Sequence, residues 1–397
     1  MLGDRKASRD RSDRRSFPTS ESHTGIDSDL LISASVLIGF GVVMSYSTTA
    51  PLSIERTIPP LFVDHVSALA VGVLAATAAA CMPLVFWYRI AFPIWFVGVL
   101  LLMATFFFGV EVNGAQRWLP IPGLGFRFQP VEPVKFATLI AVAAVVAPQD
   151  GRTPLSRKRA LIAAGMALPV VTFLLLQPDL GNAVLVSLLV AMLLLVAGLP
   201  IRQLILPGIA GVIGLAAYIA NNPYAQRRVF GFMDPWQDAQ GAGFQLVQSI
   251  IAFNQGGLFG VGLGNGKQKL FYLPEAHTDF ILSLVAEELG LVGVLIVFGA
   301  FAVLLISGTR IARRARSRFA LLLAFAITSL LAIPAAVNAA VVMGMLPTKG
   351  LTLPFLSYGG TSIVICCTLL GVLLGLSRQG GPKIGRRGRV LARGVIA

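Results

Sequence analysis

The chain has 397 residues, of which 56% are hydrophobic and only 13% are charged, and its mean hydropathy is +0.80. About a quarter of the residues in a soluble domain are charged, so this composition excludes an ordinary soluble protein. The formal net charge of +14 would suit nucleic-acid binding, but the basic residues gather at the ends of apolar runs and in both tails. That distribution indicates membrane topology and argues against nucleic-acid binding.

Ten apolar runs predict transmembrane helices. A helix needs about 20 apolar residues to cross a bilayer, and most of the runs come close to that length. The runs are Leu30–Tyr46, Val66–Met82, Ile90–Phe108, Val134–Ala147, Leu161–Leu176, Leu180–Ala197, Leu204–Ala220, Phe280–Ile306, Phe319–Met345 and Ser362–Leu376. The two shortest, Val134–Ala147 and Ser362–Leu376, are expected to extend into their flanks. We therefore expect an all-α polytopic membrane protein with about ten transmembrane helices.

The lysines and arginines predict the orientation of these helices. If the N-terminus is cytoplasmic, the inner segments hold 23 of the 32 lysine and arginine residues. This positive-inside bias predicts that both termini lie in the cytoplasm. Residues 1–29 are polar and residues 377–397 are basic and rich in glycine, so we expect two disordered tails around one membrane domain, residues 30–376.

Three segments on the predicted outer side carry further information. Glu111–Pro133 is expected to be irregular because it is rich in proline and glycine. Asn221–Asp279, the longest, separates spans seven and eight, and its residues 244–251 have the apolar spacing of an amphipathic helix. The glycines at 256–266 fit either a tight, turn-rich loop or a backbone that approaches phosphate oxygens. Leu346–Gly360 is too apolar for a solvated loop and too broken for a helix, which predicts a re-entrant segment along a cavity.

A polar cluster, Leu273–Phe280, lies where the eighth apolar run begins, and it contains Glu275, His277, Thr278 and Asp279. Polar groups at a membrane boundary are costly to desolvate, so they usually face water, a partner or a substrate. Asp279 is either the N-cap of the next helix or a general base or metal-binding carboxylate. Substitution by asparagine separates these roles, because asparagine caps helices as well as aspartate does.

Five cations lie near apolar sequence on the predicted outer side: Arg117, Lys135, Lys267, Lys269 and Lys349. Each could lie along the membrane surface with its charge among the headgroups, or it could bind an anionic substrate. Glu132 precedes Lys135 by three positions, so an ion pair is available on a helix. His277 is either a hydrogen-bonded structural residue or a proton shuttle or ligand.

Other acidic residues lie close to the apolar runs. Asp179 follows Pro178 and is expected to cap the next helix. Glu287 and Glu288 lie about two turns inside the eighth run. An intramembrane carboxylate is a candidate functional residue, and either glutamate could face a polar cavity or a partner protein.

One prominent carboxylate among several cations suits glycosyl transfer from a lipid-linked pyrophosphate. Glycosidases need two carboxyl groups because their leaving group has to be protonated, whereas a pyrophosphate leaves as an anion. Such a transferase needs a base for the acceptor hydroxyl, and cations or a divalent ion such as Mg²⁺ or Mn²⁺ for the departing phosphates. The three cysteines lie in apolar runs without metal-ligand spacing, so Asp279 is the metal ligand that this hypothesis would use.

Several motifs together resemble the SEDS family (shape, elongation, division, sporulation), which includes FtsW, RodA and SpoVE. They occur in the family's order across roughly residues 30–376 and comprise Asn113–Trp118, Gln129–Lys135, Gln177–Gly181, Gly262–Leu270, Tyr272–Phe280 and Ala286–Gly290. Pro347–Pro354 is similar to the FtsW branch. Two positions depart from the pattern: Phe271, where some FtsW members have an acidic residue, and Thr361, where serine is common.

The resemblance implies a peptidoglycan glycosyltransferase of the bacterial cytoplasmic (inner) membrane that polymerises lipid II at the division septum with a cognate class B penicillin-binding protein and other division proteins. It implies that Asp279 is the essential carboxylate. It also implies that further residues line or brace the substrate cavity: Arg117, Glu132, Lys135 and Lys349. Lys267, Lys269 and His277 are additional candidate substrate contacts because they lie close to Asp279 in the sequence.

We expect Asp279 to deprotonate the 4-hydroxyl of the acceptor GlcNAc, which attacks the donor MurNAc with inversion and releases undecaprenyl pyrophosphate. An aspartate with an ordinary pKa is a weak base, so its pKa has to rise in the cavity, or it acts by holding the metal. One alternative is a lipid II flippase, which the missing internal repeat and the one-sided charged motifs disfavour. Another is a scaffold for division proteins, which would not need the carboxylate.

Overall fold

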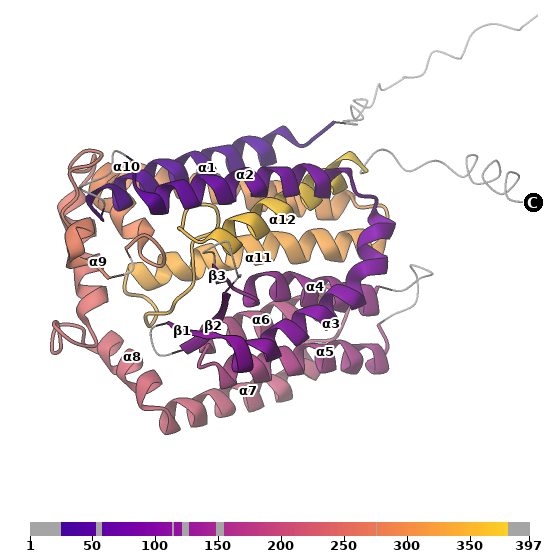
Figure 1. Ribbon diagram of the computed structural model, residues 1–397. Coiled ribbons are helices and arrows are strands. Elements are labelled where there is room, and N and C mark those ends of the chain that lie inside the picture. The colour runs from indigo at the N-terminus through magenta and orange to yellow at the C-terminus, as the bar shows by residue number, and fades with distance from the viewer. Residues whose placement is uncertain are drawn as a thin grey trace, which may run out of the picture.

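The computed structural model is a bundle of long apolar helices (Figure 1) and describes residues 25–52, 58–112, 115–120, 127–147, 155–274 and 276–379. The helices are α1 (Ser28–Thr49), α2 (Pro60–Cys81), α3 (Leu84–Phe108), α4 (Val131–Val146), α5 (Arg157–Leu176), α6 (Leu180–Val196), α7 (Arg202–Asn221), α8 (Pro223–Met233), α9 (Phe244–Gly256), α10 (Ile281–Arg314), α11 (Arg318–Val342) and α12 (Gly360–Arg378). Short helical turns are η1 (Ala50–Leu52) and η2 (Gln268–Tyr272). The strands are β1 (Val110–Val112), β2 (Ala115–Pro120) and β3 (Arg127–Phe128).

Each predicted apolar run coincides with one helix, namely α1 to α7 and α10 to α12. Eight of the described helices are both long and apolar enough to cross a membrane. The helices α4 and α6 have only 16 and 17 residues, and α4 is buried along nearly its whole length. The prediction of a polytopic helical membrane protein is confirmed, and the number of ten spans stays a prediction.

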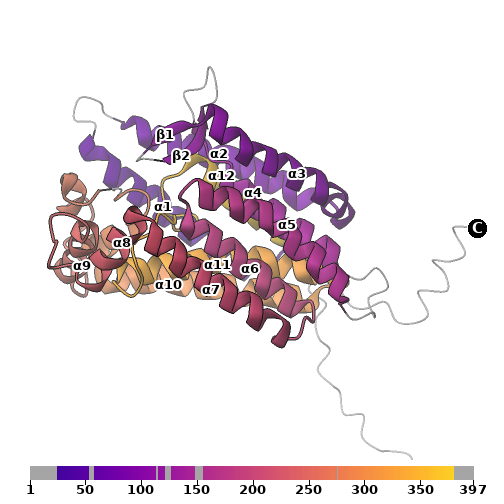
Figure 2. The ribbon, with the colours of Figure 1, turned by 90° about the horizontal axis from the view of Figure 1, so that it is seen from below.

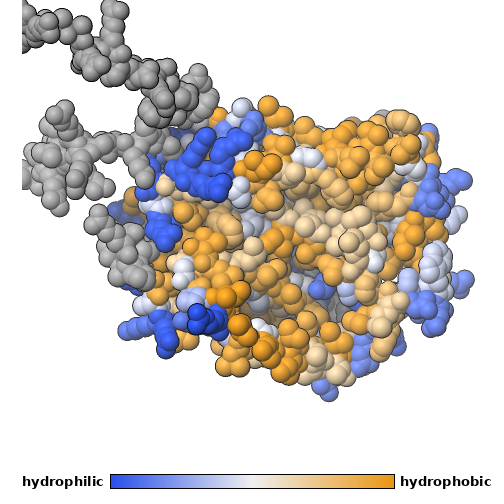
Figure 3. All heavy atoms as spheres, turned by 180° about the vertical axis from the view of Figure 1, so that it is seen from behind, coloured by the Kyte–Doolittle hydropathy of each residue, from blue (hydrophilic) through white to orange (hydrophobic). Residues whose placement is uncertain are grey.

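The outer surface of the bundle is apolar between two hydrophilic ends, as Figure 3 shows for one face. Large side chains such as Leu74 on α2, Phe107 on α3 and Leu206 on α7 are more than 70% exposed. Apolar exposure on this scale is rare on a soluble protein. A bilayer covers such a belt, because its hydrocarbon core is about 30 Å thick.

The helix α1 begins and α12 ends at the same end of the bundle, where the backbone N–H of Asp27 donates to the Ser377 hydroxyl at 3.3 Å. Arg310 of α10 pairs there with Asp29 at 2.8 Å. α8 and α9 lie at the opposite end in both Figure 1 and Figure 2. The two ends of the membrane domain therefore share one side, as predicted, while the tails 1–24 and 380–397 lie outside the described residues.

Glu111–Pro133, which we expected to be irregular, contains a three-stranded antiparallel sheet in the order β1-β2-β3. Val110 pairs with Trp118, and Leu119 pairs with Phe128. Most glycines and prolines of this segment fall in its connections or at the end of β2, where they do not interrupt the pairing. The expectation of an irregular segment was wrong here, because the aromatic and apolar residues between those breaks form strands.

The glycine-rich loop, residues 256–266, packs against a break in α10. Gly290 has a φ of +67°, and the backbone N–H groups of Val261 and Gly262 donate to the carbonyls of Glu287 and Glu288 at 3.0 and 3.1 Å. A Cβ on Gly260 would collide with the Glu288 carbonyl. These glycines therefore let the loop approach α10 closely, which fits the tight, turn-rich loop rather than a phosphate cradle.

The segment Leu346–Gly360 joins α11 to α12 and forms no helix before Gly360. Leu353, Phe355 and Leu356 are buried in the core cluster. A Cβ on Gly41 of α1 would collide with the Phe355 carbonyl, so the two backbones lie in contact. The segment is therefore irregular and partly buried, and the re-entrant segment along a cavity stays a prediction.

Candidate functional site

Asp279 lies in the turn that precedes α10. The N-cap position of α10 belongs to Phe280, and no side chain caps this helix. A Cβ built on Gly350 would lie 3.2 Å from Oδ2 of Asp279. The carboxylate thus faces the loop around Gly350, and the structural role that the sequence offered for it, as the N-cap of α10, does not apply.

Asn338, near the C-terminal end of α11, holds this turn. Its Nδ2 donates to the backbone carbonyl of Asp279 at 2.7 Å and to that of Leu351 at 2.8 Å. Asn338 is only 2% exposed. Sequence reasoning missed this residue, although a lone amide inside an apolar run was a signal that could have found it.

Two further bonds attach the same turn to the segment before α12. The Ser357 hydroxyl donates to the Thr278 carbonyl at 2.5 Å. The Tyr358 backbone N–H donates to the His277 carbonyl at 2.9 Å, and the two rings meet edge to face with centroids 5.6 Å apart. His277 thereby lies against Tyr358, and the turn that carries Asp279 is fixed by groups from α11 and from residues 351–358.

Lys349 extends from the other side of Gly350 toward the start of α6. A Cβ on Gly181 would lie 3.6 Å from Cδ of Lys349. Burial lowers the pKa of the Lys349 ammonium, and the nearby Asp179 carboxylate raises it in part. Arg228 of α8 donates to the Thr348 carbonyl at 3.0 Å and holds this loop from outside. A half-buried cation and the Asp279 carboxylate therefore border the same short loop.

Arg117 of β2 supports the turn between α5 and α6. Its Nε donates to the Gln177 carbonyl at 3.0 Å, and its Nη2 donates to the Pro178 carbonyl at 2.6 Å. The Gln177 amide in turn donates to the Thr105 hydroxyl of α3 at 2.6 Å. Arg117 is thus a bracing residue, and the small sheet that sequence reasoning missed is what positions it.

A buried polar network continues from that turn into α4. Asp179 caps α6 as predicted, accepting from the Asn182 backbone N–H at 3.2 Å and from its side-chain amide at 2.9 Å. The Asn182 Oδ1 accepts from Lys135 Nζ at 3.3 Å, and Lys135 pairs with Glu132 at 2.7 Å. The predicted ion pair three residues apart is present, and it joins α4 to α6.

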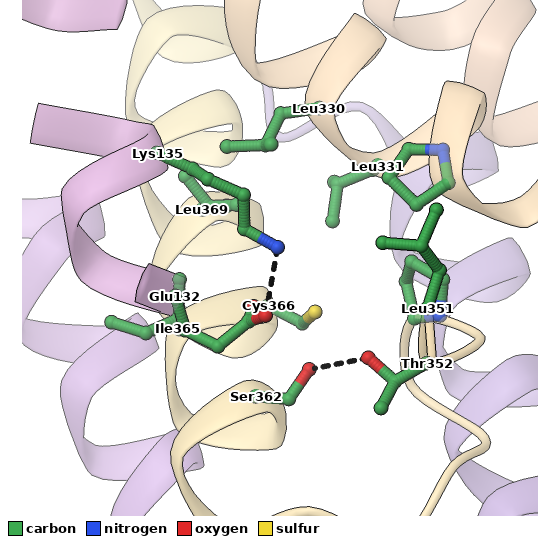
Figure 4. A pocket seen from close by; sticks show the side chains of 12 residues that line it. Glu132, Lys135, Leu330, Leu331, Leu351, Thr352, Ser362, Ile365, Cys366 and Leu369 are labelled. Carbon is green, nitrogen blue, oxygen red and sulfur yellow. Dashed lines mark hydrogen bonds and ion pairs between the residues drawn. The ribbon is translucent and has the colours of Figure 1, made fainter. Parts of the chain in front are cut away.

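Glu132 and Lys135 also project into a pocket between α4, α11, α12 and the segment 351–354 (Figure 4). The rest of its lining is Leu330, Leu331, Pro334, Leu351, Thr352, Pro354, Ser362, Ile365, Cys366 and Leu369. Thr352 and Ser362 share a hydrogen bond at 3.3 Å across one side of the pocket. Its volume is only about 20 Å³, so in this state it has room for about one water molecule beside the charged pair.

Lys267 and Lys269 lie in a different environment. The Lys269 ammonium is buried and pairs with Glu288 at 2.7 Å, and it donates to the Ser47 hydroxyl of α1 at 2.9 Å. Lys267 has an exposed side chain, and its backbone N–H donates to Glu287 at 2.7 Å. This geometry explains Lys269 as a partner for a buried carboxylate, and substrate contact by either lysine stays a prediction.

The described residues contain no group of three or more histidine, cysteine, aspartate or glutamate side chains arranged to hold a metal ion. A divalent ion at this site would therefore take Asp279 as its protein carboxylate. Mg²⁺ commonly binds through one or two carboxylates together with substrate phosphates, so the residues present fit such an ion. The expectation of a divalent cation stays a prediction.

Sequence comparison shows a full-length similarity. The family described as Cell cycle protein, named from FtsW, RodA and SpoVE, matches residues 28–380. A probable peptidoglycan glycosyltransferase FtsW from Saccharophagus degradans is 37% identical over 355 residues, which cover 88% of this chain and 91% of the relative. A protein of the same name from Aromatoleum aromaticum is 41% identical over 363 residues, covering 88% and 87%.

Solved structures have the same architecture. A chain from a structure described as "Structural coordination of polymerization and crosslinking by a peptidoglycan synthase complex" superposes with a TM-score of 0.72 at 31% identity, covering 89% of this chain and 98% of that chain. The rod shape determining protein RodA of Thermus thermophilus superposes with a TM-score of 0.65 at 27% identity, covering 90% and 98%.

Proposed function

Because this chain belongs to the FtsW, RodA and SpoVE family of cell cycle proteins and is a peptidoglycan glycosyltransferase of cell-wall synthesis, we propose that Asp279 is its catalytic base. The observation that carries this proposal is the placement of the carboxylate. It faces the Lys349–Gly350 loop instead of capping α10, and its turn is held from α11 by Asn338. A carboxylate and a cation that border one loop suit removal of a proton next to a departing anion.

In the proposed reaction Asp279 takes the proton of the 4-hydroxyl on the acceptor sugar of lipid II. That oxygen forms a bond to the anomeric carbon of the donor MurNAc as the bond to the pyrophosphate oxygen breaks. The configuration inverts and undecaprenyl pyrophosphate leaves. Lys349 stabilises the leaving charge, while Arg117 and the Glu132–Lys135 pair keep the cavity walls in place. Lys267, Lys269 and His277 are secondary candidates for substrate contact.

A divalent cation, Mg²⁺ or Mn²⁺, would be held by Asp279 together with the substrate phosphates and would supply Lewis-acid stabilisation of the leaving group. The protein's own contribution is to fix the carboxylate and to hold a cation on the loop that the carboxylate faces. Lys349 supplies that cation from a loop that α8 and α11 both hold.

We further propose that the protein acts at the division septum in the bacterial cytoplasmic membrane, with both termini in the cytoplasm. The excess of lysine and arginine on the side of the termini supports that orientation. The segment Pro347–Pro354, which resembles the FtsW branch, supports a role in division. A structural relative that is part of a peptidoglycan synthase complex supports a cognate class B penicillin-binding protein as partner.

The test is polymerisation of lipid II in detergent by purified protein with its cognate penicillin-binding protein. Asp279→Asn should lower kcat by about 10²–10⁴-fold, the contribution of a positioned base, without changing the elution volume in gel filtration. Asp234→Asn is the matched control, because Asp234 is an exposed loop carboxylate that accepts a backbone N–H at 3.3 Å. Normal glycan synthesis by Asp279→Asn would refute the assignment. A flippase or scaffold would build no glycan in detergent at all.

A further inference from the structure

Asn338 joins two separate parts of the site through a single amide group. A side-chain amide carries two N–H donors on one nitrogen. Here that nitrogen donates to the carbonyl of Asp279 at 2.7 Å and to the carbonyl of Leu351 at 2.8 Å. The first carbonyl belongs to the turn that carries the carboxylate, and the second belongs to the loop that carries Lys349.

The loop is short and tightly folded at this point. The Leu351 backbone N–H donates to the Lys349 carbonyl at 3.0 Å, so fixing Leu351 also fixes Lys349. Gly350 lies between them. A Cβ added to Gly350 would lie only 3.2 Å from Oδ2 of Asp279. The two hydrogen bonds from Asn338 therefore set how far the carboxylate lies from the loop that carries the cation.

The chain keeps this amide in an unfavourable place. Asn338 lies inside an apolar helix and is buried, and its Oδ1 has no hydrogen-bond partner among the residues that the structure describes. Burying an unpaired polar oxygen destabilises the fold and offsets part of what the two hydrogen bonds from the amide nitrogen contribute. A polar group inside an apolar membrane helix is nevertheless a candidate functional residue.

We propose that Asn338 is a positioning residue that holds the Asp279 carboxylate and the Lys349 cation in register for glycosyl transfer. This inference rests on the proposed function. Asn338 itself does not touch the reacting atoms; it acts through the backbones of Asp279 and Leu351. Aspartate offers no N–H at this place, serine offers one donor at most, and leucine offers none.

The predicted effect falls on turnover. Displacing a catalytic group by about 1 Å costs on the order of 10²-fold in rate, while substrate binding depends on the whole cavity. Asn338→Leu should therefore lower kcat by about 10²-fold and change KM for lipid II by less than about threefold. Its thermal unfolding midpoint in detergent should fall, because two carbonyls lose their donor, and removal of the unpaired oxygen should offset part of that loss.

The experiment compares Asn338→Leu and Asn338→Asp with Asn221→Asp, all as full-length protein with the cognate penicillin-binding protein. Among the described residues, Asn221 at the exposed end of α7 donates to a carbonyl of its own helix, so its variant controls for the loss of an amide. Rates are divided by the folded fraction from gel filtration. If a variant loses rate only in proportion to its folded fraction, or if Asn338→Leu polymerises at the wild-type kcat, the proposal is overturned.

A double variant tests the pathway of the effect. If Asn338 acts by spacing Asp279 and Lys349, combining Asn338→Leu with Lys349→Gln should cost less than the product of the two single losses. If the rate losses of the two single variants multiply in the double variant, that pathway is contradicted. Asp279→Asn, measured alongside, separates the two hypotheses: if it is active, the proposed function fails, whereas if it is inactive and Asn338→Leu is normal, only the role of Asn338 fails.

Discussion

Two buried lysine–glutamate pairs in this protein have the same length and different surroundings. Lys135–Glu132 and Lys269–Glu288 each have an N–O distance of 2.7 Å. The side chains of the first pair are 7% and 11% exposed and line the pocket, whereas those of the second are 4% and 0% exposed. The distance within a pair therefore does not reveal its role.

The two pairs differ in the groups that their other polar atoms bind. In the first pair, Lys135 also donates to Asn182, and Asn182 donates to Asp179. The Asp179 carboxylate in turn interacts electrostatically with Lys349. In the second, the Glu288 carboxylate accepts from Ser47 of α1 and from the backbone of Gly264. One pair leads toward the cavity and the other fastens the glycine-rich loop to α10. The first should therefore matter more for turnover and the second more for folding.

The largest expected effect comes from breaking the enclosed pair. Glu288→Gln leaves the Lys269 ammonium buried without its direct ion-pair partner, which should destabilise the protein by about 3–5 kcal/mol. The thermal unfolding midpoint and the folded yield in detergent measure this loss. Adding Lys269→Met to Glu288→Gln should restore most of the stability, because a methionine carries no charge. A single variant with wild-type stability would contradict the structural role of this pair.

Breaking the pair in the pocket should cost less stability and more turnover. Lys135→Met leaves a Glu132 side chain that is 11% exposed, so the stability loss should be smaller, about 1–3 kcal/mol. Lipid II polymerisation by the folded fraction should nevertheless fall further than in the Lys269→Met/Glu288→Gln double variant, because the wall next to Asn182 is disturbed. Equal turnover in the two variants would remove the distinction between the pairs.

The helices were predictable because their signal is local. An apolar run of sufficient length has few alternatives to a helix, and all ten runs form one. The Asp179 cap and the Glu132–Lys135 pair were also predictable, because three residues separate the partners in each case. The sheet was missed because β1 and β3 have only three and two residues, too few to show an alternating pattern.

The geometry of the site was not predictable from local pattern. Asn338 lies 59 residues from Asp279, and Lys269 lies 19 residues from Glu288. Both contacts depend on where the chain turns back on itself, and the second also requires the break in α10 at Gly290. The sequence could mark Asp279 and Lys349 as candidates by residue type, but only the fold shows that they border one loop.

Lys349 offers the smallest expected effect and the most specific test, because it is half-buried, whereas both lysine–glutamate pairs are buried. Burial lowers its pKa and the Asp179 carboxylate opposes that shift, so the ammonium loses its proton at a lower pH than an ordinary lysine. If the cation stabilises the leaving pyrophosphate, kcat/KM should fall as the pH rises through this lowered pKa. Lys349→Arg should remove that alkaline limb, with a change in stability of no more than about 0.5 kcal/mol.

Asp179→Asn should shift the alkaline limb of the same pH profile in the other direction. Asparagine caps α6 as well as aspartate does, so the helix should stay intact while the charge that raises the Lys349 pKa disappears. The alkaline limb should then move to lower pH, in the direction opposite to the effect of Lys349→Arg. An identical limb in wild type and both variants would show that another group titrates there, and Lys349 would then be a loop residue without an electrostatic part in the reaction.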